Sequence, residues 1–159
     1  MKKLILLFLV FLIMPKFILA AEIMHPSLII KSADGKNFDL EKQLGKVVIV
    51  NFWVSWCGEC QAEMVVLKEL YSQYRSQGLE IVGISIDRKK DRDIFSKISE
   101  KLSYPNFMLV DAKANQFGEP NSLPTTYIID RKGNVVKSDI LQQDEISKKD
   151  FEKILHQIL

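Results

Sequence analysis

A β-branched run that leads directly into a pair of cysteines sets narrow limits on the fold of this chain. Residues 46–53 read Lys-Val-Val-Ile-Val-Asn-Phe-Trp, a pattern typical of a strand buried on both faces of a sheet. Cys57 and Cys60 follow, and residues 64–74 then repeat apolar side chains at helical spacing. This order predicts that the two cysteines lie between a buried strand and the N-terminus of a helix.

The remainder of the chain predicts a single α/β domain. A second apolar run over residues 79–86 completes a β-α-β unit, whose two strands are expected to be parallel. Further strands are predicted over residues 28–30, 38–40, 107–110, 125–129 and 135–140, and helices over residues 91–101 and 151–158. The resulting order, β-β-β-α-β-α-β-β-β-α, predicts one domain built on a single mixed sheet.

The N-terminus has the pattern of an export signal. Lys2 and Lys3 precede an uncharged apolar run over residues 4–14, and small residues follow at Ala20 and Ala21. We therefore predict that residues 1–20 are a signal peptide and that residues 21–159 form a domain in the periplasm or another extracytoplasmic compartment.

An uncleaved anchor in the inner membrane is the alternative for this segment. Cleavage after Ala20 or after Ala21 would not occur at an ideal A-x-A site, so an uncleaved anchor stays a valid alternative. Against it, a spanning helix needs about 20 mostly apolar residues, and Pro15 and Lys16 interrupt the apolar stretch here.

Charge and cysteine content exclude several classes of protein. The chain is 26% charged with a net charge of +2, so it has neither the composition of a disordered acidic segment nor the basic excess of a nucleic-acid-binding domain. Two cysteines are too few for a small disulfide-stapled scaffold. We expect no nucleic-acid partner.

A C-x-x-C pair at the start of a helix is suited to thiol–disulfide exchange. The free N–H groups and the positive end of the helix dipole stabilise a thiolate there. We predict that Cys57 is the exposed nucleophile and that Cys60, one turn into the helix, is the buried resolving thiol. A purely structural disulfide across two residues would stabilise the fold little. A zinc site would need two ligands besides the cysteines, and the chain offers only His25 and His156, which lie near its opposite ends, so no metal is predicted.

Two segments resemble the motifs of a known family. Residues 52–60, Phe-Trp-Val-Ser-Trp-Cys-Gly-Glu-Cys, resemble the active-site segment of thioredoxin-like proteins, and residues 61–64 look like the TlpA/ResA type of extracytoplasmic thiol-disulfide oxidoreductase. Residues 123–130, Leu-Pro-Thr-Thr-Tyr-Ile-Ile-Asp, match the second family motif, in which the proline is cis and faces the disulfide. The resemblance covers about residues 27–140. It implies a thioredoxin-like fold: a mixed central sheet flanked by helices, with an N-terminal β-hairpin.

The resemblance also implies roles for individual residues. Glu63, which shares a helix face with Cys60, matches a catalytic glutamate that tunes the thiols and handles the proton of Cys60; a solvated helix glutamate is the alternative. Trp56 matches an exposed tryptophan that shields the disulfide. Leu123 and Pro124 match a segment that offers backbone groups to an extended substrate peptide, a form of strand addition.

Three positions depart from the family pattern: Glu59, Asn51 and Val65, the last of which stands where relatives often have proline. Glu59 stands between the cysteines where relatives usually carry proline, and a carboxylate there would disfavour the Cys57 thiolate and so favour the disulfide. This makes the reduced protein a better reductant; alternatively, Glu59 only complements the helix dipole. Asn51 stands where thioredoxin has a buried aspartate, and an amide cannot act as a base.

The predicted function is reduction of protein disulfides by a monomeric enzyme without a cofactor. By resemblance, a substrate is apocytochrome c during cytochrome c maturation, and a membrane or periplasmic dithiol protein supplies the electrons. The alternatives are a disulfide donor in oxidative folding and a metal chaperone that uses both thiolates. A peroxidase is disfavoured because residues 54–56, Val-Ser-Trp, replace the Thr-x-x-Cys context of peroxiredoxins.

Overall fold

The computed structural model describes residues 26–32, 35–137 and 147–159. The predicted export segment, residues 1–20, lies outside the described residues, as do residues 138–140 of the last expected strand. The strands are β1 Leu28–Lys31, β2 Asn37–Asp39, β3 Val47–Trp53, β4 Leu79–Ser85, β5 Asn106–Met108, β6 Ala112–Asn115, β7 Thr125–Ile129 and β8 Val135–Lys137, and the helices are α1 Gly58–Tyr74, α2 Arg92–Ser99 and α3 Lys148–Ile158. Of these helices, none has the length and apolar character needed to cross a membrane.

The described strands form the mixed central sheet that the resemblance implies, but they do not all join it, so the expectation of one sheet for every strand is wrong. The larger sheet has the order β5-β4-β3-β7-β8, and the smaller one has the order β2-β1-β6. In the larger sheet β3 runs parallel to β4 and antiparallel to β7, which makes it mixed. The N-terminal hairpin β1-β2 is present as predicted, but β6 completes its sheet instead of the central strands.

Strand β6 was not predicted because its sequence, Ala-Lys-Ala-Asn, has low β-propensity and no apolar alternation. It is held by antiparallel pairing with β1 and not by its own side-chain pattern. The strand expected over residues 107–110 is also shorter than predicted: β5 ends at Met108, and a 3₁₀ turn over Leu109–Asp111 leads into β6.

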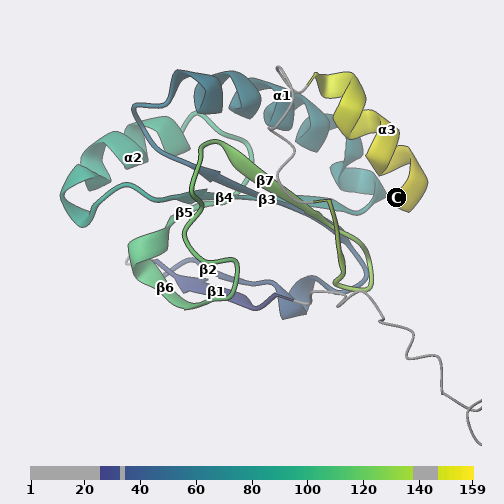
Figure 1. The fold of residues 1–159 in the computed structure, drawn as a ribbon, viewed down its shortest axis with the longest axis horizontal. Coiled ribbons are helices and arrows are strands. Elements are labelled where there is room, and N and C mark those ends of the chain that lie inside the picture. The colour runs from purple at the N-terminus through teal and green to yellow at the C-terminus, as the bar shows by residue number, and fades with distance from the viewer. Residues whose placement is uncertain (1–25, 33–34, 138–146) are drawn as a thin grey trace, which may run out of the picture.

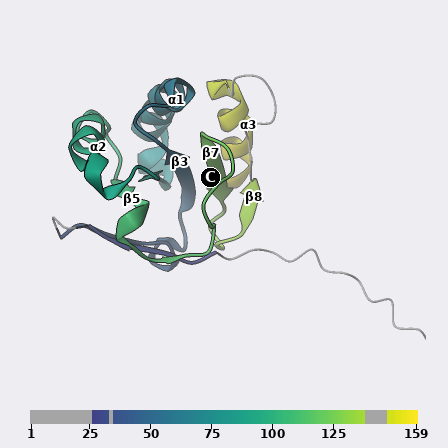
Figure 2. The ribbon, with the colours of Figure 1, turned by 60° about the vertical axis from the view of Figure 1, so that its left-hand side comes forward.

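The molecule has three layers. The three helices lie on one face of the five-stranded sheet, and the small sheet covers the opposite face (Figures 1 and 2). Strand β3 is buried along its whole length, as its composition predicts, and its side chains alternate between these two layers. Val48 and Val50 belong to the core beneath the small sheet, whereas Val47 and Ile49 pack against the helices. The same alternation places Asn51 on the helical side.

The predicted β-α-β unit sets the position of the cysteines. Helix α1 follows β3 and leads back to the parallel strand β4. It turns into a 3₁₀ segment that ends at Gly78, whose φ of 98° is the left-handed conformation common at helix ends. The start of α1 is therefore fixed at the end of a fully buried strand.

Candidate active site

A disulfide joins Cys57 and Cys60 at the N-terminus of α1, with an S–S distance of 2.08 Å. Cys57 is the residue that caps the helix, and its Sγ accepts a hydrogen bond of 3.1 Å from the backbone N–H of Cys60. The sulfur of Cys57 therefore lies where the free N–H groups of a helix meet an anion. A thiolate formed there on reduction would gain from this hydrogen bond and from the helix dipole.

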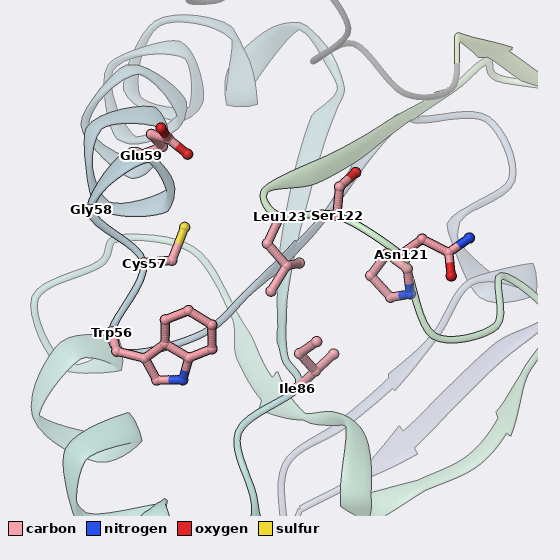
Figure 3. A pocket seen from close by; sticks show the side chains of 9 residues that line it. Trp56, Cys57, Gly58, Glu59, Ile86, Asn121, Ser122 and Leu123 are labelled. Atoms are coloured by element: carbon pink, nitrogen blue, oxygen red, sulfur yellow. The ribbon is translucent and has the colours of Figure 1, made fainter.

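The two sulfurs differ in access. Cys57 retains 8% exposure and Cys60 none, so the predicted exposed nucleophile is in fact largely covered. Cys57 instead lines a cleft of about 580 Å³, and Cys60 does not. Figure 3 shows the residues of this cleft: Trp56, Cys57, Gly58, Glu59, Ile86, Pro120, Asn121, Ser122 and Leu123. A substrate can reach Cys57 through this opening.

The structure brings the second motif to the first. The antiparallel pairing of β7 with β3 places Thr125 opposite Phe52, so the chain that enters β7 arrives beside the cysteines. Leu123 lines the cleft across from Cys57 (Figure 3). The Leu123–Pro124 bond is cis, as the resemblance implies, and Pro124 is buried. Trp56, at 80% exposure, stands at the rim of the cleft.

Glu63 is buried, at 6% exposure, which rules out the solvated alternative. Its carboxyl group accepts a hydrogen bond of 2.6 Å from Asn51 Nδ2 at Oε2 and one of 2.9 Å from Thr126 Oγ1 at Oε1. Asn51 Nδ2 also donates to Thr126 Oγ1 over 2.9 Å. The three side chains form a closed polar cluster between α1 and the central sheet.

Burial raises the pKa of Glu63 from its ordinary 4.5 to about 7, because the charged carboxylate is disfavoured away from water. The hydrogen bonds from Thr126 and Asn51 act in the opposite direction, since they stabilise the ionised form, but they offset only part of the effect. A carboxyl group with a pKa near neutrality can both take up and release a proton at physiological pH.

Sequence reasoning missed that Asn51 and Thr126 are partners of this glutamate. Asn51 and Thr126 are directly opposite each other in the β3-β7 pairing. A signal was present in the sequence: Asn51 is a polar residue inside an otherwise apolar buried strand, and such a residue must find a hydrogen-bond partner. Its partner could not be identified without knowing that β7 lies beside β3.

Asp87 is a second residue that the sequence did not single out. It follows β4, is buried, and accepts 2.9 Å hydrogen bonds from the backbone N–H and the hydroxyl of Ser55. The hydroxyl of Ser85 donates to the same carboxylate over 2.7 Å. Because Ser55 lies two residues before Cys57, Asp87 fixes the segment that leads to the sulfur of Cys57.

Replacing Asp87 by asparagine should lower the free energy of unfolding by about 1–3 kcal/mol. The amide would place a donor where one of the serine groups already donates, and that group would stay buried without an acceptor. Chemical denaturation measures the change. Asp93→Asn, on the exposed face of α2, is the matched control, and equal stability of the two variants would show that Asp87 does not fix the segment.

Within the described ranges, no three histidine, cysteine, aspartate or glutamate side chains gather in a way that could hold a metal ion. Cys57 and Cys60 are engaged with each other. The chemistry that this arrangement can perform with its own groups is the making and breaking of a disulfide, next to an ionisable carboxyl group.

Known proteins are similar to this chain in sequence and in fold. Residues 21–138 match the AhpC/TSA family. A Bacillus cereus protein named thiol-disulfide oxidoreductase ResA is 32% identical over 138 residues, which are 84% of this chain and 75% of the relative. Its Bacillus subtilis namesake is 30% identical over 112 residues, 70% of this chain and 63% of the relative.

Solved structures of thiol:disulfide interchange proteins have a similar fold. A Chlorobium tepidum crystal structure described as a DsbE-type thiol:disulfide interchange protein superposes with a TM-score of 0.70 at 22% identity, over 85% of this chain and 95% of that one. A second Chlorobium tepidum structure, of a thioredoxin-family thiol:disulfide interchange protein, gives a TM-score of 0.66 at 26% identity, over 84% and 93%. The fold is thioredoxin-like.

Proposed function

Because the chain belongs to the AhpC/TSA family of thioredoxin-like proteins and is a thiol-disulfide oxidoreductase of the ResA type, we propose that it reduces disulfides of other proteins through Cys57 and Cys60. The observation that carries this proposal is the unequal access of the two sulfurs. Cys57 caps α1 and lines the cleft, while Cys60 is fully enclosed.

The reaction proceeds by two successive exchanges. The thiolate of reduced Cys57 attacks one sulfur of the substrate disulfide, the substrate S–S bond breaks, and the departing sulfur takes the electron pair and a proton. Cys60, as a thiolate, then attacks Sγ of Cys57 and displaces the second substrate sulfur. The substrate gains two electrons and two protons, and the protein is left with the Cys57–Cys60 disulfide seen in the structure.

Glu63 serves the second exchange. Cys60 must lose its thiol proton before it can attack, and its full burial keeps bulk water from accepting that proton. Glu63 lies one turn further along the same helix face. With a pKa of about 7, its carboxylate is available as a base near neutral pH.

The cleft holds the substrate. An extended peptide places its half-cystine against Cys57 between Trp56 and Leu123, and the backbone of the segment before Pro124 is available for strand-like hydrogen bonds. This geometry suits a disulfide in an unfolded or flexible chain better than one buried in a folded domain.

The proposal extends to the compartment and the partners. The export-type pattern of residues 1–20 supports an extracytoplasmic location, with the segment either removed or retained as a membrane anchor. The resemblance of residues 52–64 to the TlpA/ResA type implies the apocytochrome c haem-site disulfide as substrate. A membrane or periplasmic dithiol protein then re-reduces the monomeric enzyme.

The reduction potential of the Cys57–Cys60 couple tests the direction of electron flow. A reductant should have a potential below about −200 mV, and a disulfide donor for oxidative folding should lie near about −120 mV. Equilibration with defined glutathione mixtures, followed by alkylation and mass measurement, gives the value. Cys57→Ser, which cannot form the couple, sets the baseline. A potential near that of a strong oxidant would contradict the proposed direction.

A further inference from the structure

Among the residues that the structure describes, one ionisable side chain besides the cysteine itself lines the cleft around Cys57. Of its lining residues, only Glu59 is acidic or basic; the others are apolar or neutral: Trp56, Gly58, Ile86, Pro120, Asn121, Ser122 and Leu123. Within the described part of the chain, no lysine, arginine or histidine lines this cleft. Glu59 is therefore the main side-chain source of the electrostatic potential that a substrate experiences beside Cys57.

Glu59 is free to act on a substrate. It is exposed in the first turn of α1, and within the part of the chain that the structure describes no residue forms an ion pair or hydrogen bond with its carboxylate. On the opposite wall, the residue directly before Pro120 is Glu119, which is also exposed. Among the described residues that line the cleft, none carries a positive charge that could neutralise Glu59.

Trp56 adds a second group that favours a cation. Its indole ring is 80% exposed and stands at the rim on the other side of Cys57 from Glu59 (Figure 3). Among the described residues it has no aromatic or cationic partner. The face of a tryptophan ring attracts ammonium and guanidinium groups, and it does so more strongly than other aromatic rings. A carboxylate and an indole thus flank the nucleophile.

We propose that Glu59 is a specificity residue that selects disulfides with a lysine or arginine side chain beside the attacked half-cystine. The inference rests on the proposed function and names its substrate class. During exchange, the negative charge of the attacking thiolate spreads over the sulfurs of the reacting centre, and the carboxylate of Glu59, which lines the same cleft two residues after Cys57, repels that charge. A cation carried by the substrate offsets that repulsion, whereas an acidic neighbour adds to it.

The size of the preference follows from exposure. Contacts between exposed charges are weak and screened by salt, so a lysine peptide should react about fivefold faster than its glutamate counterpart at low ionic strength. At about 1 M salt the screening length falls to about 3 Å, and the preference should almost vanish.

Three disulfide peptides that differ at one position beside the half-cystine, lysine, glutamine or glutamate, test this proposal. The reduced protein is mixed with each, and kcat/KM is measured with a chemical dithiol as the electron source. We expect the order lysine, glutamine, glutamate in the native protein and a ratio near one in Glu59→Gln. Glu100→Gln, an exposed glutamate that does not line the cleft, should keep the native ratio.

The comparison separates the two proposals. A change of Cys57 reactivity caused by Glu59→Gln affects all three peptides alike and cancels in the ratio. Equal rates for the three peptides in the native protein, or an unchanged ratio in Glu59→Gln, would overturn the role of Glu59 and leave the reductase function standing. Failure of the native protein to reduce any peptide would overturn the proposed function, and the selectivity with it.

Discussion

Cys57→Ser is expected to lose disulfide reduction down to the rate of the buffer. The structure gives a substrate access to Cys57 and encloses Cys60 completely, so no second sulfur can replace the first. A serine hydroxyl at neutral pH is not ionised and does not attack a disulfide. The loss should exceed about a thousandfold, the scale on which enzymes respond to removal of their nucleophile. Turnover of a disulfide peptide with a chemical dithiol measures it.

Cys60→Ser should fail differently. Its Cys57 can still attack, so in an assay of the prereduced variant without added dithiol each molecule releases one equivalent of substrate thiol and then stops, because no other thiol resolves the mixed disulfide. A single-turnover burst followed by a plateau distinguishes it from Cys57→Ser, which shows no burst. A burst in Cys57→Ser would mean that Cys60 is the attacking residue.

Glu63→Gln is expected to slow the release of product about a hundredfold at neutral pH, the usual contribution of a general base. Glutamine has nearly the same shape but cannot take the proton of Cys60. In the native protein this step should accelerate as pH rises through about 7, where Glu63 ionises. The variant should keep only the later rise caused by the thiols. Stopped-flow measurement of the second exchange between pH 5 and 9 shows both profiles.

Glu63 also makes the free energy of unfolding depend on pH, and the direction of this dependence follows from its raised pKa. The pKa of Glu63 is raised from 4.5 to about 7 in the folded protein, so the folded state holds this proton more tightly than the unfolded state. The stabilisation of the folded state by this tighter proton binding is fully present below pH 4.5, declines between pH 4.5 and 7, and is absent above pH 7. At 1.36 kcal/mol per pKa unit, the loss amounts to about 3 kcal/mol.

Glu63→Gln removes that dependence. The difference in free energy of unfolding between native protein and variant should therefore shift by about 3 kcal/mol in favour of the variant as pH rises from 4.5 to 7. Glu69→Gln, an exposed glutamate on the same helix, should show no such shift. Parallel profiles for the native protein and Glu63→Gln would mean that Glu63 is not the buried titrating group.

The centre of the fold could be predicted from the sequence because its signals are local. A β-branched run, a C-x-x-C pair and a helical apolar stripe follow one another within residues 46–74, and each is produced by neighbouring residues. Strand β6 has no such signal, since it exists only through its pairing with β1. The separation into two sheets depends on the same non-local pairing.

The motifs of the candidate site could be predicted from the sequence, but the hydrogen bonds that connect its buried side chains could not. Spacing of three residues places Glu63 on the face of Cys60 without saying whether that face is buried. Its burial depends on Thr126, which lies 63 residues further along the chain. Asp87 likewise acts on Ser55 across 32 residues. The exposure of Cys57 was overestimated because the wall that contains Leu123 comes from a distant segment.

The identity of the sulfur that captures a substrate decides whether exchange proceeds through Cys57. Cys60→Ala, incubated in reduced form with a disulfide-bonded peptide, should accumulate a mixed disulfide on Cys57 with a stoichiometry near one, as shown by mass spectrometry of the intact protein and its digest. Cys57→Ala, which retains Cys60, should capture none. Absence of the adduct in Cys60→Ala, or equal capture by Cys57→Ala, would contradict exchange through Cys57.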